Sequence, residues 1–189
     1  NWGGVVLALQ NPSDRSIVCN SSVEDYYRFV EGACSHYGDN LLLKLHPWNR
    51  NEVEERFTNI ANKYNTRIGR FGHSVLDNCS FCLVYSSGFA FDCFLRDVPV
   101  AVFSPSYFWQ TKAVTYTSRT FPNKVNDTVE YANKLADFVV WRYMFDMQQS
   151  SGKWLDMFRH VNQSKELFPI NDTFCYAKSI LNRCKQKEK

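Results

Sequence analysis

The sequence predicts an α/β fold in which helices cover both faces of a Rossmann-like parallel sheet. Short apolar runs, which suit buried strands, alternate along the chain with segments whose apolar residues recur at helical spacing. Such strict alternation calls for right-handed crossovers between parallel strands. With 189 residues, of which 44% are hydrophobic and 22% charged, the chain can bury one core, so disordered and low-complexity classes are excluded.

The first half of the chain is predicted to open with a strand and a long helix. A continuous apolar run places the strand at residues 5–9, and a turn-rich loop follows at 10–14. Apolar residues recur every three or four positions over 22–37. We therefore predict a helix there, with Ser22 as its N-cap and Gly38 as its end.

A second strand and a second helix follow in the same order. The strand is predicted at residues 41–45 and stops before a His-Pro pair. Asn51 is the expected N-cap of the helix, because an acidic turn and an amphipathic stretch come after it. A short third strand is expected near residues 67–71.

The remaining chain continues the alternation and then becomes helical. The expected elements are a helical turn at 74–78, a strand at 80–85, a short helix at 89–95, a strand at 98–103 and an aromatic loop at 104–121. Beyond the loop, helices are predicted at 128–147, 153–161 and 173–185.

Charge and cysteine content limit the partners and the compartment. A net charge of +3 without a clustered Lys/Arg face argues against a nucleic-acid partner, and no apolar run approaches the roughly 20 residues of a membrane span. Seven cysteines, an odd number, lie mostly in apolar segments and favour a reducing, cytoplasmic location. Glycans found at Asn20 or Asn126 would overturn that location. The chain has five Asn-x-Ser/Thr sequons, at Asn20, Asn78, Asn126, Asn162 and Asn171.

Polar side chains gather where three predicted strands end. They are Gln10 and Asp14 after the first strand, Lys44 and His46 at the end of the second, and Ser86 and Ser87, followed by Gly88, after the strand at 80–85. Because parallel strands end at one edge of a sheet, we expect these loops to share a crevice. Lysine, histidine and a Ser-Ser-Gly turn before a helix suit a phosphorylated sugar donor. Each element alone has an ordinary reading, such as a strand end or a turn.

Together these residues resemble the C-terminal half of bacterial capsule polysaccharide synthesis proteins, the retaining β-Kdo glycosyltransferases that use CMP-Kdo. The likeness extends over roughly residues 3–120. It rests on a Gln-x-x-x-Asp loop (Gln10, Asp14), a Lys-x-His-Pro strand end (Lys44, His46, Pro47), and a Ser-Ser-Gly turn (Ser86, Ser87, Gly88) leading through a helix to Pro99 and Val100. The paired His-Pro and Ser-Ser motifs are also similar to those of bacterial CMP-sialic acid transferases.

The resemblance implies a role for each of these residues. Asp14 would be the nucleophile of a double displacement, with Gln10 as a positioning residue. The donor-binding residues would be Lys44, His46 and Pro47 on one side of the CMP phosphate, Ser86, Ser87 and Gly88 on the other, and Asp92 at the ribose, where the family has a glutamate. No metal or other cofactor is implied, because lysine and histidine carry the charge and there is no Asp-x-Asp pair.

The resemblance also implies how the chain is organised and what it meets. Residues 1–122 would be a Rossmann-like donor-binding domain, and 123–189 C-terminal helices that pack on it or reach a partner domain. Enzymes of this kind have two facing GT-B domains, so an N-terminal domain, in the same protein or a separate chain, would supply the glycan or glycolipid acceptor site. Peripheral association with the inner face of a membrane is compatible with such an acceptor. The chain alone would turn over weakly or not at all.

A reading from another class stays open, a non-catalytic Rossmann-like nucleotide-binding or interaction module. Asp14 separates the two functions, because a pure binding module has no evident need for a carboxylate in that loop.

Other candidate sites are interpreted as structural. The pair Cys79 and Cys82 is expected in the core, because no partner sits at zinc spacing. The isolated histidines, His36, His73 and His160, are expected in surface or polar roles. The aromatic loop either stacks on a base or sugar or packs under the C-terminal helices; its aromatic residues are Tyr107, Phe108, Trp109 and Tyr116.

Overall fold

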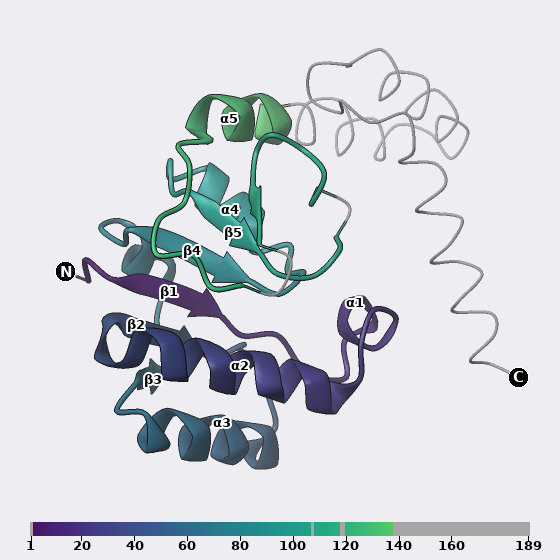
Figure 1. The fold of residues 1–189 in the computed structure, drawn as a ribbon, viewed down its shortest axis with the longest axis vertical. Coiled ribbons are helices and arrows are strands. Elements are labelled where there is room, and N and C mark those ends of the chain that lie inside the picture. Colours follow the sequence, from purple (N-terminus) through teal and green to yellow (C-terminus); the bar gives the residue numbers. More distant parts are fainter. Residues whose placement is uncertain (1, 107, 118–119, 138–189) are drawn as a thin grey trace, which may run out of the picture.

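In the computed structural model, which describes residues 2–106, 108–117 and 120–137, six parallel strands form one sheet in the order β3-β2-β1-β4-β5-β6 (Figure 1). The strands are β1 (Val5–Ala8), β2 (Leu41–Lys44), β3 (Arg67–Gly69), β4 (Phe81–Val84), β5 (Val100–Val102) and β6 (Thr115–Tyr116). The helices are α1 (Arg15–Val18), α2 (Val23–Tyr37), α3 (Asn51–Lys63), α4 (Ala90–Phe94) and α5 (Val129–Asp137), with 3₁₀ turns η1 (Gly38–Asn40) and η2 (His73–Leu76).

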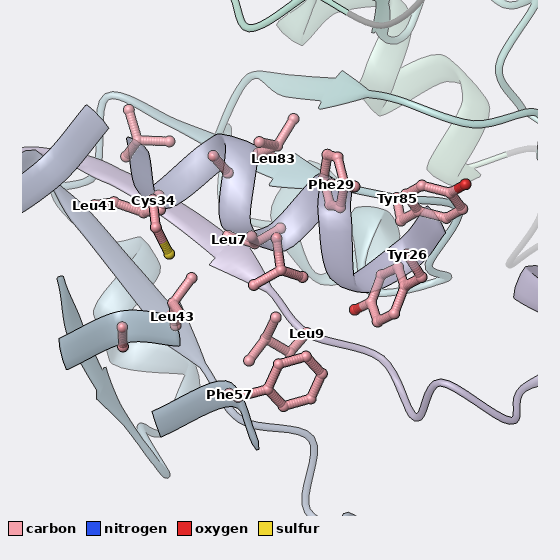
Figure 2. Close-up of a cluster of buried hydrophobic side chains, with 14 of the residues drawn as sticks. Leu7, Leu9, Tyr26, Phe29, Cys34, Leu41, Leu43, Phe57, Leu83 and Tyr85 are labelled. Carbon is pink, nitrogen blue, oxygen red and sulfur yellow. The ribbon is translucent and has the colours of Figure 1, made fainter. Parts of the chain in front are cut away.

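The sheet confirms the predicted α/β class, with a core on each face. One core packs odd-numbered strand residues such as Leu7, Leu43 and Leu83 against α2 and α3. Figure 2 shows these three leucines with Tyr26 and Phe29 of α2. The other core packs the intervening residues of the same strands against α4 and α5. The strands are therefore apolar on both sides, which is why they read as continuous apolar runs.

The ends of α2 are those that the sequence predicts. Ser22 is the N-cap: its hydroxyl accepts from the amide of Asp25 at 3.0 Å, and the Asp25 carboxylate accepts from the Ser22 amide, which completes a capping box. Gly38 ends the helix with a φ of 55°, in the half of conformational space that favours glycine.

One local prediction is corrected, and two short elements were not predicted. Asn51 is the first residue of α3 rather than its N-cap, which is Arg50, because the Arg50 carbonyl already accepts from the amides of Val53 and Glu54. The four-residue α1 and the two-residue β6 were not predicted, since elements this short show no periodicity. Helix α1 lies in the loop after β1, and β6 lies in the predicted aromatic loop.

The described part of the C-terminal region is α5, which begins one residue after the predicted start at 128 and packs against α4. Ala132, Leu135 and Ala136 belong to the same core as α4, and the Asn133 side chain donates to the Asp97 carboxylate at 3.1 Å. The predicted helices at 153–161 and 173–185, with Tyr107, His160, Asn162 and Asn171, lie outside the described residues. Among the described helices, none is both long enough and apolar enough to cross a bilayer.

Candidate functional site

The predicted site residues lie at the carboxyl ends of three adjacent strands. In the register of the sheet, Ala8 of β1 stands opposite Lys44 of β2 and Val84 of β4. Gln10, His46 and Ser86 each follow two residues after that row. Figure 1 shows the arrows of β1 and β4 pointing the same way, with α1 beyond the tip of β1. Since β2 and β4 flank β1 on opposite sides, this edge is the switch point at which open α/β sheets bind ligands.

Gln10 joins the loops that follow β1 and β4. Its side chain is buried, and its Oε1 accepts from the Ser86 amide at 3.0 Å while its Nε2 donates to the Ser16 hydroxyl at 2.9 Å. The backbone amide of Gln10 donates to the hydroxyl of Tyr26 at 2.7 Å. Burial raises the pKa of Tyr26, so its hydroxyl stays protonated. Gln10 therefore positions two loops and a helix relative to one another.

Asp14 is exposed and caps α1. Its Oδ1 accepts from the amide of Ser16 at 3.0 Å and from the Ser16 hydroxyl at 3.1 Å. This cap explains a carboxylate here without any catalytic role, because aspartate is among the preferred N-cap residues. The expectation that a non-catalytic module has no need for this carboxylate is therefore wrong.

Lys44 extends from the end of β2 towards α4. Its Nζ lies 5.1 Å from the centre of the Phe89 ring, a cation–π arrangement. Partial burial lowers the pKa of Lys44, and the Asp92 carboxylate opposes this shift. The ammonium group thus lies over the Phe89 ring, near enough to the Asp92 carboxylate of α4 for that charge to act on it.

His46 is half-buried in the turn that connects β2 to α3. Burial is the main cause that lowers its pKa, the neighbouring Asp14 carboxylate opposes the shift, and Lys44 adds to it. The charges of Asp14 and Lys44 therefore both act on His46 at the ends of β1 and β2. Next to His46, Trp48 is 82% exposed, and its ring centre is 5.8 Å from that of the imidazole.

The two serines after β4 differ in their surroundings. Ser86 is buried, and its hydroxyl donates to the Ser16 carbonyl at 3.3 Å. Ser87 is half-buried, and its hydroxyl accepts from the Phe89 amide at 3.2 Å, while Gly88 is exposed. Of the two hydroxyls, the one nearer the surface belongs to Ser87.

His73 joins the site, although the sequence suggests that it is isolated. Its Nε2 lies 3.4 Å from Oδ1 of Asp92, and its ring stacks on Phe89 with 5.5 Å between ring centres. The signal that could have found His73 is its place after β3, at the same edge of the sheet. Nothing in the sequence pattern identified Phe89 or Trp48 as neighbours of Lys44 and His46.

Two other groups of candidate residues lie away from this edge: the cysteines in or against the core, and His36 at the surface. The Cys82 side chain is buried in the core beside α4, and Cys79 packs against that core. Burial raises the pKa of Cys79 to about 12, which keeps the thiol protonated. His36 lies at the surface, with Nε2 3.0 Å from Oδ1 of Asn123. Within the described ranges, no three His, Cys, Asp or Glu side chains are grouped so as to hold a metal ion.

The lowered pKa of His46 predicts a pH dependence of stability. Because burial disfavours the imidazolium, the folded chain binds fewer protons at His46 than the unfolded chain, whose histidines titrate at about 6.5. This contribution is complete above that pH and is lost as the pH falls through the lower, folded pKa. We expect the free energy of unfolding, measured in urea, to fall between about pH 7.5 and about pH 5, and to fall less in His46→Gln. An equal fall in both proteins would contradict the burial of His46.

The chain was also compared with known proteins. No family model and no curated protein matches it. Among solved structures, Thermosulfurimonas dismutans KpsC, a β-Kdo 2,7 transferase, aligns with a TM-score of 0.48 at 16% identity, covering 70% of this chain and 45% of KpsC. A GtfA/B complex aligns with a TM-score of 0.39 at 12% identity, covering 97% of this chain and 36% of the other. The chain thus spans less than half of each of these proteins, and its α/β class rests on the sheet itself.

Proposed function

We propose that this chain is the donor-binding domain of a glycosyltransferase, which transfers Kdo or a related sugar from a CMP-sugar to a hydroxyl group with retention. The observation that carries the proposal is the meeting of Asp14, Lys44 and His46 at the switch point of the sheet. A carboxylate, an ammonium and an imidazole from the ends of adjacent strands are close enough to shift the pKa of His46. The resemblance of their motifs to CMP-Kdo transferases supports the nucleotide class.

The donor would lie across the ends of β2 and β4. Lys44 supplies the positive charge for the phosphate, and His46 and the Ser87 hydroxyl supply hydrogen bonds. Gly88, with no side chain, leaves room for close approach to the backbone. Asp92 would hold the ribose hydroxyls, for which its contact with His73 has to open or turn aside. Ser86 contributes indirectly, because its amide and hydroxyl are used within the protein.

The reaction would take two displacements at the anomeric carbon. In the first, a carboxylate oxygen of Asp14 bonds to that carbon, the bond from the carbon to the phosphate oxygen breaks, and CMP leaves with the electron pair. In the second, an acceptor hydroxyl attacks the same carbon, loses its proton to a base, and releases the Asp14 carboxylate. Both capping bonds of Asp14 are made to Oδ1, so Oδ2 is the oxygen we assign to the attack.

The acceptor and the base belong to parts of the enzyme beyond this domain. We propose that a facing N-terminal GT-B domain supplies both, and that the acceptor is a polysaccharide, glycan or glycolipid. We place the reaction in the cytoplasm, at the inner face of a membrane when the acceptor is a lipid. Burial of Cys34, Cys82 and Cys93 in the core, where cysteine packs as a small apolar side chain, supports a reducing compartment.

Calorimetric titration of this chain with CMP, UMP and GMP tests the donor assignment. We expect CMP to bind most tightly, and His46→Ala to weaken CMP binding by about 10- to 100-fold, as expected when a hydrogen bond to a charged group is lost. His36→Ala is the matched control, because His36 lies on α2 beside Asn123, and it should bind CMP as the unmodified chain does. Absence of binding by all three nucleotides, or equal CMP binding in His46→Ala, would refute the site.

The second candidate is a nucleotide-binding or interaction module without catalysis. It is favoured by one observation, the use of the Asp14 carboxylate as the N-cap of α1. A nucleotide-binding module would bind CMP, yet transfer no sugar even when the facing domain is supplied. An interaction module would bind none of the three nucleotides.

A further inference from the structure

The turn that follows β2 brings a backbone amide within hydrogen-bond distance of a ring nitrogen of His46. The amide of Asn49 donates to the carbonyl of His46 at 3.2 Å, which closes a four-residue turn with Pro47 and Trp48 at its centre. Proline suits the second position of such a turn, because its ring presets φ there. Inside this turn, the amide of Trp48 donates to Nδ1 of His46, also at 3.2 Å.

This hydrogen bond determines which ring nitrogen holds the proton. A backbone N–H can only donate, so Nδ1 must offer a lone pair and cannot itself be protonated. A neutral imidazole with a bare Nδ1 carries its proton on Nε2. Protonating the ring would set two N–H groups against each other, at a half-buried position where burial already lowers the pKa of His46.

We infer that the His46-Pro47-Trp48 turn holds His46 as the neutral Nε2–H tautomer. His46 then donates a hydrogen bond to the sugar nucleotide, and Lys44 supplies the positive charge. This inference rests on the proposed function for its ligand, a phosphate oxygen of a nucleotide. Pro47 and the backbone amide of Trp48 are positioning groups: neither has to touch the donor. Under this inference Lys44 alone neutralises the phosphate, whereas the sequence analysis assigns that role to Lys44 and His46 together.

Charged groups around the ring act in opposite directions. Lys44, at the end of β2, disfavours a second positive charge on His46, whereas the Asp14 carboxylate ahead of α1 favours one. Burial is the largest of these influences, and it lowers the pKa of His46 in spite of the Asp14 carboxylate. Since Asp14 is also the proposed nucleophile, a neutral His46 does not form a salt bridge that would weaken its attack.

Nitrogen NMR of the imidazole tests the tautomer without any ligand. With ¹⁵N-labelled histidine, long-range proton–nitrogen spectra at about pH 7 should show a protonated Nε2 and a bare Nδ1 for His46, assigned by their absence in His46→Gln. Trp48→Ala keeps the backbone amide and should give the same pattern. A protonated Nδ1, or an imidazolium at that pH, would overturn the inference. Because no nucleotide is present, this result is independent of whether CMP binds.

Two amide variants test the consequence for binding. The side-chain amide of glutamine reaches about as far along the side chain as Nε2, and that of asparagine about as far as Nδ1. We expect His46→Gln to bind CMP within about 3-fold of the unmodified chain, and His46→Asn to lose about 10-fold or more. Equal affinities of the two variants, whether high or low, would overturn the donor role of Nε2–H. If the unmodified chain binds no CMP, the proposed function fails while the NMR result stands by itself.

Discussion

Asp14→Asn is expected to abolish sugar transfer and to leave CMP binding nearly unchanged. Asparagine caps helices about as well as aspartate, so its Oδ1 can still accept from the Ser16 amide. The amide has no carboxylate oxygen to attack the anomeric carbon. In an enzyme that includes the facing domain, we expect transfer to fall by about three orders of magnitude or more, as when a nucleophilic unit is disabled.

The pair of readouts separates three roles for Asp14. Asp14→Ala loses the cap as well as the nucleophile, so it should also lower the free energy of unfolding by about 1 kcal/mol, which Asp14→Asn should not. Asp127→Asn is the matched control, because Asp127 makes the same type of hydrogen bond to the amide of Val129 ahead of α5. It should leave transfer unchanged. Full transfer by Asp14→Asn would leave Asp14 as a cap only, and loss of CMP binding would make it a donor-holding residue.

Gln10→Met is expected to lower the free energy of unfolding by about 2–4 kcal/mol, measured in urea. Methionine nearly keeps the length and volume of glutamine, so the loss reflects hydrogen bonds rather than a cavity. The buried amide of Ser86 would be left without its acceptor, and the Ser16 hydroxyl would lose its donor. CMP binding should weaken too, because the loop that carries Ser87 is no longer tied to the loop after β1.

A second glutamine provides the control for Gln10. Gln110 is half-buried in the loop after β5, and Gln110→Met should change the free energy of unfolding by about 0.5 kcal/mol or less. If Gln10→Met were equally mild, the hydrogen bonds of Gln10 would not hold the two loops together. In that case the placement of Ser87 opposite His46 would have to come from the packing of the strands alone.

The sequence predicted five of the six strands of the sheet, and which of them carry polar residues at their ends. These features are local. Apolar runs give the strands, the capping box of Ser22 and the glycine at position 38 give the ends of α2, and alternation requires parallel strands. Because parallel strands all end at one edge, the sequence could also place Lys44, His46 and Ser87 at the same edge of the sheet.

Only the tertiary structure decided how these residues act on one another. Gln10 and Ser86 are 76 positions apart, and they meet because β4 pairs with β1 in a register that no local pattern encodes. The contact of His73 with Asp92 depends likewise on where η2 and α4 lie after folding. Burial, which lowers the pKa values of Lys44 and His46, exists only once the neighbouring elements have packed.

The role of Asp14 shows the same division most clearly. Its place in a turn-rich loop is legible from the sequence, as is its distance of four residues from Gln10. That it caps a four-residue helix, and that its charge acts on His46, follows from the path of the chain after β1. Local sequence therefore determined which groups are present at the edge of the sheet, and strand order determined which of them face each other, because contacts between distant segments are set by packing.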